Sequence, residues 1–295
     1  MLKQYLNFNI QKKFKKSIIL IGNFDGLHSG HQKLFRIAKS YAKKFKLKVG
    51  VLTFEPLPVM FFNKKIKNFR ITNNYQKKIL FKKEGVNFII VKKFDKKFSK
   101  ISSLDFIKNI IAKKLNPKFI FVSDNFRYGF NRTGNVKQLK NYEKIYKYKI
   151  INPSPFKNNK KIVSSTLIRK YLQDGKLKIV NKLLKRRWSI NGVVRRGKQI
   201  GKKMGFPTCN LYMSDYILPK LGVYSVITKI GNSNKNIKGI ANIGQRPTFG
   251  GKEVFLEVFL FNFNGNLYNK TLNVQFCSFI RNEKKFISPK HLVQQ

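Results

Sequence analysis

The sequence predicts an α/β, doubly wound domain followed by a small all-β Greek-key barrel. In the first half, short apolar runs alternate with segments whose apolar residues recur at helical spacing, a pattern typical of a parallel sheet with helices on both faces. After Trp188, strand-like segments follow one another with turns between them and little helix. The 295 residues are enough for two domains, which we place at residues 1–186 and 187–295.

The first strand is expected at residues 18–21, where four apolar residues precede Gly22. Three glycines within residues 22–30 indicate a loop, and a helix is expected from Gln32 onward. The same reasoning predicts further strands at residues 48–54, 88–91 and 119–122, and helices at residues 70–80 (with Thr72 as N-cap), 103–115 and 167–184.

Two histidines, His28 and His31, fall between the first strand and the first helix. Open α/β sheets bind ligands at such junctions, and the free N–H groups of a helix N-terminus attract phosphate. Each imidazole can donate a hydrogen bond to a phosphoryl oxygen. A pair of surface histidines would show the same spacing. A zinc site needs further Cys or His ligands, and His291 is the only other histidine in the sequence.

Three further loops are expected at the same edge of the sheet, at residues 53–56, 123–129 and 163–169. In the last of these, Ser165 or Thr166 can cap a helix that contains Arg169. Hydroxyl groups, helix N–H groups and a guanidinium suit the binding of pyrophosphate. A plain capped helix with a surface arginine is the alternative interpretation.

In the second half, strands are expected at residues 189–194, 223–230, 238–243, 254–263 and 271–279, and Asn264-Gly265 is a favourable pair for a hairpin turn between the last two. Residues 196–210 form a basic segment in which Gly197, Gly201 and Gly205 recur every fourth residue. We interpret it as a flap that closes over phosphates, or equally as a basic β-turn.

Thr208 and Asn210 alternate, so in an extended segment they point the same way and suit Mg²⁺ or phosphate. Glu257 lies in an apolar strand, where we expect it to be buried. A buried carboxylate is costly unless it is paired or functional. Glu257 is therefore either a general base for an attacking alcohol or a member of a structural ion pair.

The chain carries 63 Lys and Arg against 12 Asp and Glu, a formal charge of +51. Such a charge is typical of binding to nucleic acid or to an anionic membrane. Lysine is spread through both halves, however, together with other residues of A/T-rich codons, so we expect no specific nucleic-acid partner. No run of 18 apolar residues is present, so we expect no membrane partner.

The chain has only two cysteines, which is too few for a disulfide framework. This favours a protein that works in the reducing cytoplasm.

Four motifs of the first half resemble the adenylyltransferase half of the bifunctional riboflavin kinase/FAD synthetases, in the same order. These motifs are residues 22–31, 53–56, 126–129 and 164–169. The resemblance implies a nucleotidyltransferase-like fold in which His28 and His31 stabilise the transferring α-phosphoryl group. It also implies nucleotide and phosphate contacts for Gly22, Asn23, Asp25, Ser164, Ser165, Thr166 and Arg169, and FMN contacts for Asp124 and Arg127.

The second half is similar to the riboflavin kinase module of the same family. The matching segments are residues 205–210, 222–224, 239–248, 256–258, 265–268 and 280–286. The resemblance implies that Thr208 and Asn210 bind Mg-ATP. The flap interpretation places Gly197, Gly201 and Gly205 near its phosphates. The resemblance further implies that Glu257 is the base for the ribityl 5′-hydroxyl and that Arg281 lies near the flavin.

The resemblance therefore implies a bifunctional enzyme with riboflavin, FMN and ATP as substrates and Mg²⁺ as cofactor. Its first half would form FAD and its second half FMN. Leu57, Ser123 and Asn125 depart from the family's pattern, which motivates the alternative of a riboflavin kinase with a decayed adenylyltransferase half. A nucleic-acid-binding protein on the same scaffold is a third hypothesis. The sequence leaves the oligomeric state open.

Overall fold

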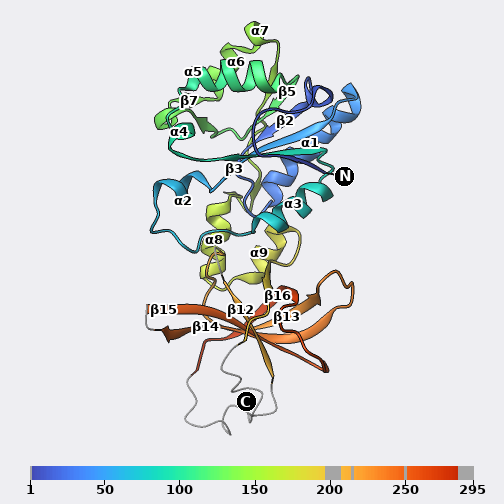
Figure 1. Cartoon of the computed structure of the whole chain (residues 1–295), viewed down its shortest axis with the longest axis vertical. Helices are drawn as coiled ribbons and strands as arrows, with labels where there is room; N and C mark the ends of the chain where they lie inside the picture. Colours follow the sequence, from blue (N-terminus) through green and yellow to red (C-terminus); the bar gives the residue numbers. More distant parts are fainter. Residues whose placement is uncertain (1, 197–206, 214–215, 249–250, 285–295) are drawn as a thin grey trace. The chain divides into compact units, whose positions relative to one another are not determined.

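Figure 1 shows the computed structural model, which describes residues 2–196, 207–213, 216–248 and 251–284. The chain forms two compact units. The first comprises Met1–Ile66 and Asn74–Ser164, and the second comprises Lys67–Asn73 and Ser165–Gln295. These units do not divide at residues 186/187, and the predicted boundary between the two domains stays a prediction.

The first unit contains a six-stranded sheet in the order β1-β4-β3-β2-β5-β8, and every pair in it is parallel. The strands are β1 (Lys3–Tyr5), β2 (Ile18–Ile21), β3 (Val49–Glu55), β4 (Phe88–Lys93), β5 (Phe119–Phe121) and β8 (Lys149–Ile151). The four predicted strands are confirmed. Because β3 and β5 both pair with β2 in parallel, the loops after these three strands open on one edge.

Helices cover both faces of this sheet. Ile18 and Leu20 pack with residues of α1 (Ser29–Phe45) and α3 (Asn74–Lys83), whereas Ile19 and Ile21 face the opposite cluster. That cluster includes the helix η2 (Phe106–Leu115), which has π winding, and α6 (Val136–Asn141). The doubly wound α/β prediction is therefore confirmed.

Shorter elements complete this unit. They are η1 (Lys12–Phe14), α2 (Pro58–Phe62), α4 (Lys96–Ser99), α5 (Ser103–Asp105), β6 (Arg127–Tyr128), η3 (Phe130–Arg132), β7 (Gly134–Asn135), α7 (Glu143–Tyr146), β9 (Lys157–Asn158) and β10 (Lys161–Ile162). The helix predicted from residue 70 with Thr72 as its N-cap begins instead at Asn74, and Thr72 is buried before it.

The helix predicted over residues 167–184 is two helices, α8 (Ser165–Gln173) and α9 (Leu177–Leu184). Gly175 interrupts them with a φ of 72°, a left-handed conformation that favours glycine. The amphipathic pattern runs through both helices, so helical spacing alone did not reveal the break.

The second unit contains a six-stranded antiparallel sheet in the order β11-β16-β13-β14-β15-β12. Its strands are β11 (Ser189–Val193), β12 (Thr208–Tyr212), β13 (Gly222–Ile230), β14 (Ile237–Thr248), β15 (Gly251–Leu260) and β16 (Thr271–Arg281). Strands β13 to β15 form a meander and β16 returns beside β13, which is a Greek-key order. An Arg195–Asn210 bridge brings the ends of the sheet together, so the barrel is nearly closed.

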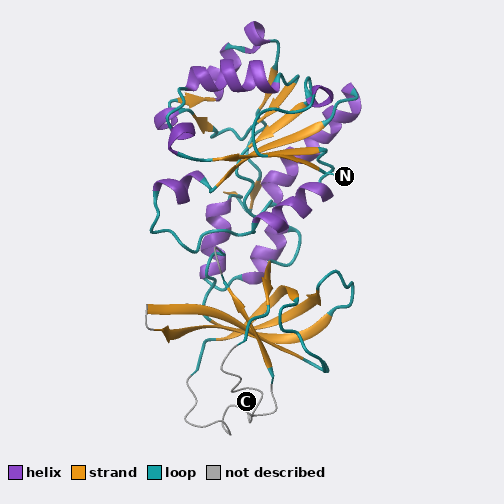
Figure 2. Cartoon of the chain, viewed as in Figure 1, coloured by secondary structure: helices purple, strands orange, loops and turns teal. Residues whose placement is uncertain are grey.

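The predicted hairpin at Asn264-Gly265 is wrong. Strand β15 pairs with β14 and β12, whereas β16 pairs with β13 and β11, so the segment between β15 and β16 crosses the barrel. Local turn propensity indicates a change of direction here, but the partners of the two strands are set by long-range packing. Figure 2 draws the strands of this unit as orange arrows.

Helix α9 belongs to the barrel unit, and the Asn181 side chain connects it to this unit by two hydrogen bonds. Asn181 Oδ1 accepts from the Trp188 N–H at 2.7 Å, and Asn181 Nδ2 donates to the Phe276 carbonyl at 3.0 Å. The buried Trp188 ring packs on Phe276 with ring centroids 4.9 Å apart. Its indole N–H donates to the Ile71 carbonyl at 2.9 Å, which ties residues 67–73 to the same unit.

We expect Asn181→Ala to lower the stability of the second unit by about 1–3 kcal/mol, because a backbone N–H and a carbonyl lose their partners. Calorimetry would show this as a lower unfolding temperature of that unit. The matched control is Lys182→Ala, which removes an exposed side chain from the same helix and should leave the transition unchanged. Equal melting of the two variants would contradict this role.

Candidate functional site

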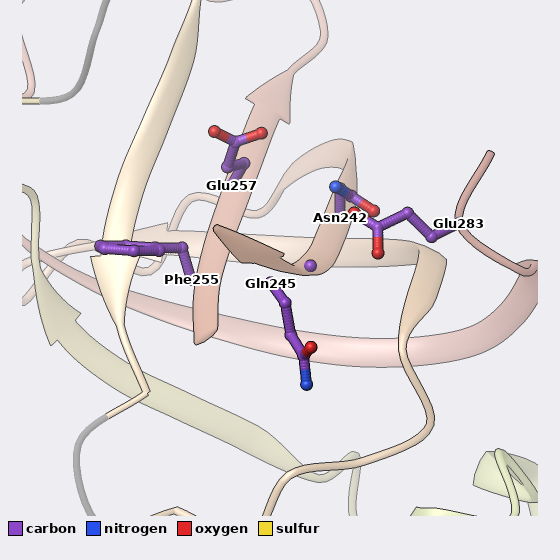
Figure 3. Close-up of a pocket in the computed structure, with 6 residues that line it drawn as sticks. Asn242, Gln245, Phe255, Glu257 and Glu283 are labelled. Atoms are coloured by element: carbon purple, nitrogen blue, oxygen red, sulfur yellow. The ribbon is translucent and has the colours of Figure 1, made fainter. Parts of the chain in front are cut away.

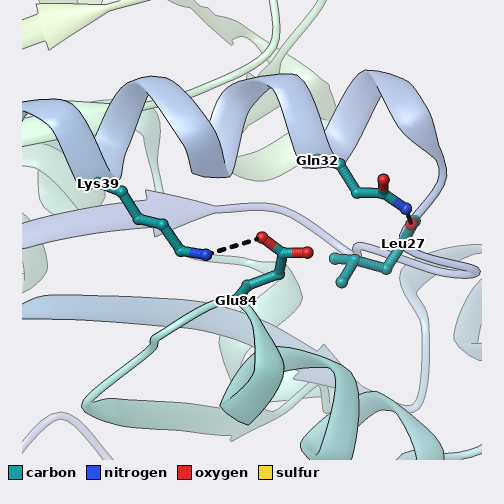
Figure 4. Close-up of polar contacts among 4 residues, drawn as sticks. All are labelled: Leu27, Gln32, Lys39 and Glu84. Carbon is teal, nitrogen blue, oxygen red and sulfur yellow. Dashed lines mark hydrogen bonds and ion pairs between the residues drawn. The ribbon is translucent and has the colours of Figure 1, made fainter.

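The loop between β2 and α1 is held in a fixed, strained conformation. Phe24 and Leu27 have left-handed φ values of 47° and 39°, which cost about 1–2 kcal/mol each for residues other than glycine. The Phe24 ring packs edge-on against Phe35, with ring centroids 5.2 Å apart. Gln32 Nε2 donates a hydrogen bond to the Leu27 carbonyl at 2.9 Å (Figure 4). Backbone strain of this kind is concentrated at functional sites.

This loop delivers His28 and His31 as a stacked pair at the start of α1. His28 is the residue before the helix, and the two ring centroids lie 3.7 Å apart at an interplanar angle of 23°. The Phe24 ring contacts the His31 ring edge-on, with ring centroids 5.2 Å apart. His31 Nδ1 is buried and has no hydrogen-bond partner in the described part of the chain. Both imidazoles therefore lie next to the free N–H groups at the N-terminus of α1, a long helix.

The environment keeps His31 neutral. Burial lowers its pKa well below the ordinary value of 6.5, and His28 and Lys77 lower it further by charge repulsion. Lys77 is itself buried on α3. In the described residues, no group of three or more His, Cys, Asp and Glu could hold a metal ion. The positive charge of Lys77 close to the pair suits an anionic ligand such as phosphate.

Other predicted residues of the first unit come to the same loop. The backbone carbonyl of Asn23 accepts from Thr53 Oγ1 and from Lys77 Nζ, both at 3.4 Å, and Asp25 is buried. A Cβ on Gly30 would lie 3.2 Å from His28 Nδ1 and from the Val163 carbonyl. The backbone leading to Ser164 therefore passes beside the first turn of α1, and a side chain at position 30 would crowd it.

Ser165, Thr166 and Arg169 belong to α8, in the second compact unit. The Arg169 guanidinium stacks on the Phe69 ring at 3.7 Å, and its Nε donates to the Phe69 carbonyl at 2.8 Å. Arg169 therefore has a packing role in this unit. Its predicted contact with phosphate is not tested by these bonds and stays a prediction.

The predicted FMN-contacting residues follow β5. Asp124 and Arg127 are both exposed, and Asp124 accepts from Asn152 Nδ2 at 3.2 Å. Ser123, which departs from the family's pattern, does not have a positive φ, so a side chain at this position costs no backbone strain. The loop opens on the same edge as the histidine loop because β5 pairs with β2.

In the barrel, three polar residues lie abreast on neighbouring strands. Glu257 of β15 is directly opposite Asn210 of β12 on one side and Asn242 of β14 on the other. Residues in register on adjacent strands project from the same face of a sheet. Thr208, two residues before Asn210, shares this face and is exposed.

The expectation that Glu257 is buried among apolar residues is wrong. Leu256 and Val258 are fully buried and point into the barrel, so strand alternation puts Glu257 on the opposite face, where it is partly exposed. In this position the carboxylate is accessible to a substrate, and it still lies beside Asn210 and Asn242.

Figure 3 shows a pocket at this face, with the Asn242 amide beside the Glu283 carboxylate. A Cβ at Gly244 would collide with Glu283, so glycine makes room for that carboxylate. Asn210 Oδ1 and Asn242 Oδ1 are buried and accept no hydrogen bond in the described part of the chain. Amide oxygens next to carboxylates form a donor set that fits Mg²⁺. The pocket is lined by Asn242, Gly244, Gln245, Phe255, Glu257 and Glu283.

Sequence reasoning missed Asn242, Glu283 and Lys77. Asn242 and Glu283 lie in segments that carry the family resemblance, but only strand register and the pocket show that they meet Glu257. Arg281 is partly exposed at the end of β16, where its Nη1 donates to the Asn282 carbonyl at 3.1 Å. Gly197, Gly201 and Gly205 lie outside the described residues.

Comparisons with known proteins match both halves. A family model for FAD synthetase matches residues 10–167, and one for riboflavin kinase matches residues 184–295. The bifunctional riboflavin kinase/FMN adenylyltransferase of Buchnera aphidicola from Acyrthosiphon pisum is 41% identical over 97% of this chain and 92% of its own length. The Escherichia coli K12 protein of the same name is 34% identical over 94% of this chain and 88% of its own length.

A solved structure described as a macrolide-efflux protein from Streptococcus pneumoniae superposes with a TM-score of 0.85. It is 30% identical to this chain and covers 99% of it, with 94% of the solved chain matched. Among the described residues, every helix is too short or too polar to cross a membrane.

We expect the His31 imidazole to titrate well below pH 6.5 in an NMR titration of the ring signals, with His31→Gln identifying its resonance. Because the folded state disfavours the charged ring, its contribution to stability is complete above pH 6.5 and is lost as the pH falls. An imidazole that titrates at or above 6.5 would contradict the described environment.

Proposed function

The chain belongs to the bifunctional riboflavin kinase/FMN adenylyltransferase family, and we propose how its residues carry out the two reactions. The enzyme phosphorylates riboflavin with ATP to give FMN and ADP. It then adenylylates FMN with a second ATP to give FAD and pyrophosphate. This function rests on one observation: the FAD synthetase model and the riboflavin kinase model both match this single chain. The first match contains the histidine pair, and the second contains the polar row around Glu257.

In the adenylyl transfer, a phosphate oxygen of FMN attacks the α-phosphorus of ATP, and pyrophosphate leaves. No covalent enzyme intermediate is needed, since positioning and charge stabilisation suffice. His28 and His31 donate hydrogen bonds to the α-phosphoryl oxygens as charge develops there. Their stacking on one another and the edge contact of Phe24 support fixed rings at the N-terminus of α1.

The remaining predicted residues bind the substrates of this reaction. Gly22, Asn23 and Asp25 shape the nucleotide pocket, and Ser164, Ser165, Thr166 and Arg169 hold the ATP phosphates. Asp124 and Arg127 contact FMN. The common edge of the loops after β2, β3 and β5, and the approach of Val163 to Gly30, support the placement of those residues that lie in the first unit.

In the kinase reaction, Glu257 takes the proton from the ribityl 5′-hydroxyl while the hydroxyl oxygen attacks the γ-phosphorus and ADP leaves. Thr208 and Asn210 hold the Mg²⁺ of Mg-ATP, which when bound neutralises charge on the phosphates. Gly197, Gly201 and Gly205 cover the phosphates, and Arg281 lies near the flavin. The register of Asn210 opposite Glu257 and the buried Asn210 Oδ1 support this arrangement.

We further propose that the enzyme works in the cytoplasm, because Cys209 and Cys277 are both free thiols. The charge of +51 is spread along the whole sequence, which supports weak binding of polyanions in general rather than a specific nucleic-acid partner.

Replacing both histidines (His28→Ala with His31→Ala) should abolish FAD formation and leave FMN formation intact, because the kinase site lies on the barrel. Chromatography of the products from riboflavin and Mg-ATP measures both. Lys39→Ala is the matched control on α1, since its ion pair with Glu84 at 3.3 Å is exposed and contributes little (Figure 4). Continued FAD formation by the double variant would overturn the role of the pair.

Glu257→Gln should show the reverse, because an amide cannot accept the hydroxyl proton. We expect riboflavin phosphorylation to fall by about 10²–10⁴-fold, while FAD formation from supplied FMN persists. A Glu257→Gln variant that phosphorylates riboflavin at the wild-type rate would contradict the assignment.

Asn210→Ala should raise the Mg²⁺ concentration needed for half-maximal kinase activity, because one oxygen ligand is lost. The control is Cys209→Ala, whose side chain points to the other face of β12 and should leave the Mg²⁺ dependence unchanged. Equal Mg²⁺ dependence of Asn210→Ala and the wild type would remove Asn210 from the cation site.

A further inference from the structure

Lys77 is a buried lysine beside the histidine pair that the function described above does not use. Only 3% of it is exposed, although lysine is almost always at the surface. Its Nζ donates to the Asn23 carbonyl at 3.4 Å, within the loop that joins β2 to α1. Burying an ammonium group is costly, so its position calls for an explanation beyond packing.

The packing of α3 fixes Lys77 in this place. Phe81, one turn further along α3, is buried and contacts both Phe24 and Phe35, with ring centroids 5.9 Å apart in each case. The helix that carries Lys77 is therefore locked against the loop and against the helix that carries His31.

Lys77 also acts on His31 through its charge. The groups that act electrostatically on His31 are His28, at the start of the same helix, and Lys77, from α3. Asp25 is the carboxylate of the same loop and is buried there. A fixed ammonium near two imidazoles adds to the positive field at the N-terminus of α1, where an anionic group would be stabilised.

We propose that Lys77 is a positioning residue for FMN adenylylation, which holds the backbone of the histidine loop through Asn23 and keeps a fixed positive charge beside His28 and His31. This inference rests on the proposed adenylyl-transfer site. It adds a residue from α3, a helix that none of the sequence motifs of that site includes.

The test compares Lys77→Met, Lys77→Arg and the matched control Lys78→Met, which removes the same charge from the neighbouring, exposed position of α3. We expect FAD formation to fall by about tenfold or more in Lys77→Met, with recovery in Lys77→Arg and no change in Lys78→Met. Riboflavin phosphorylation, measured on the same protein, should stay at the wild-type level and reports that the chain is folded.

The decisive readout is the ionisation of His31. In Lys77→Met, both the pKa of His31 measured by NMR and the acidic limb of the pH profile of FAD formation should move to higher pH, because a repelling charge is gone. Unchanged ionisation of His31, or an unchanged rate of FAD formation, would overturn the proposal. If the wild-type protein forms no FAD at all, the proposed function fails instead, so the two failures are distinguishable.

Discussion

The register of paired strands is the constraint on which both sites depend. In the first unit, parallel pairing of β2 with β3 and β5 brings three loops to one edge, although they are separated by about 30 and 70 residues in the chain. In the barrel, antiparallel pairing puts Asn210, Glu257 and Asn242 in one row. A slip of one residue would turn Glu257 into the apolar interior and Val258 out of it.

The histidine loop shows how the first unit offsets the cost of its site. Left-handed backbone at Phe24 and Leu27, a buried lysine and a buried neutral imidazole are each unfavourable. The Phe24 ring packs edge-on against both Phe35 and Phe81, so the residue with the strained backbone is also part of the core. Apolar burial of an aromatic ring contributes about 1.5–3 kcal/mol, which is comparable to the strain.

Much of this architecture could be predicted from the sequence because its signals are local. The apolar run 18–21, the glycines after it and the helix that follows gave the strand, loop and helix that carry His28 and His31. Long-range pairing was beyond such reasoning. The favourable turn pair Asn264-Gly265 does not join paired strands, and the meeting of Asn242 with Glu257 depends on register.

Burial was also mispredicted, for a related reason. The apolar neighbours of Glu257 suggested a buried strand, but strict alternation gives such a strand one inward and one outward face. Lys77 was overlooked because its importance lies in tertiary packing of α3 on α1, and a lysine in a chain of 63 basic residues carries no signal of its own.

The scarcity of acidic residues sharpens the interpretation of the barrel pocket. The whole chain has 12 Asp and Glu. Several of these have local structural roles: Asp95 accepts from the Phe98 N–H at the start of α4, which lowers the pKa of that carboxyl, and Glu143 accepts from the Ile150 N–H. Glu257 and Glu283 line a single pocket, although like charges repel. Two of the twelve carboxylates thus lie in one pocket with the buried amide oxygen of Asn242. This combination of oxygen ligands supports the proposed binding of a cation at the barrel.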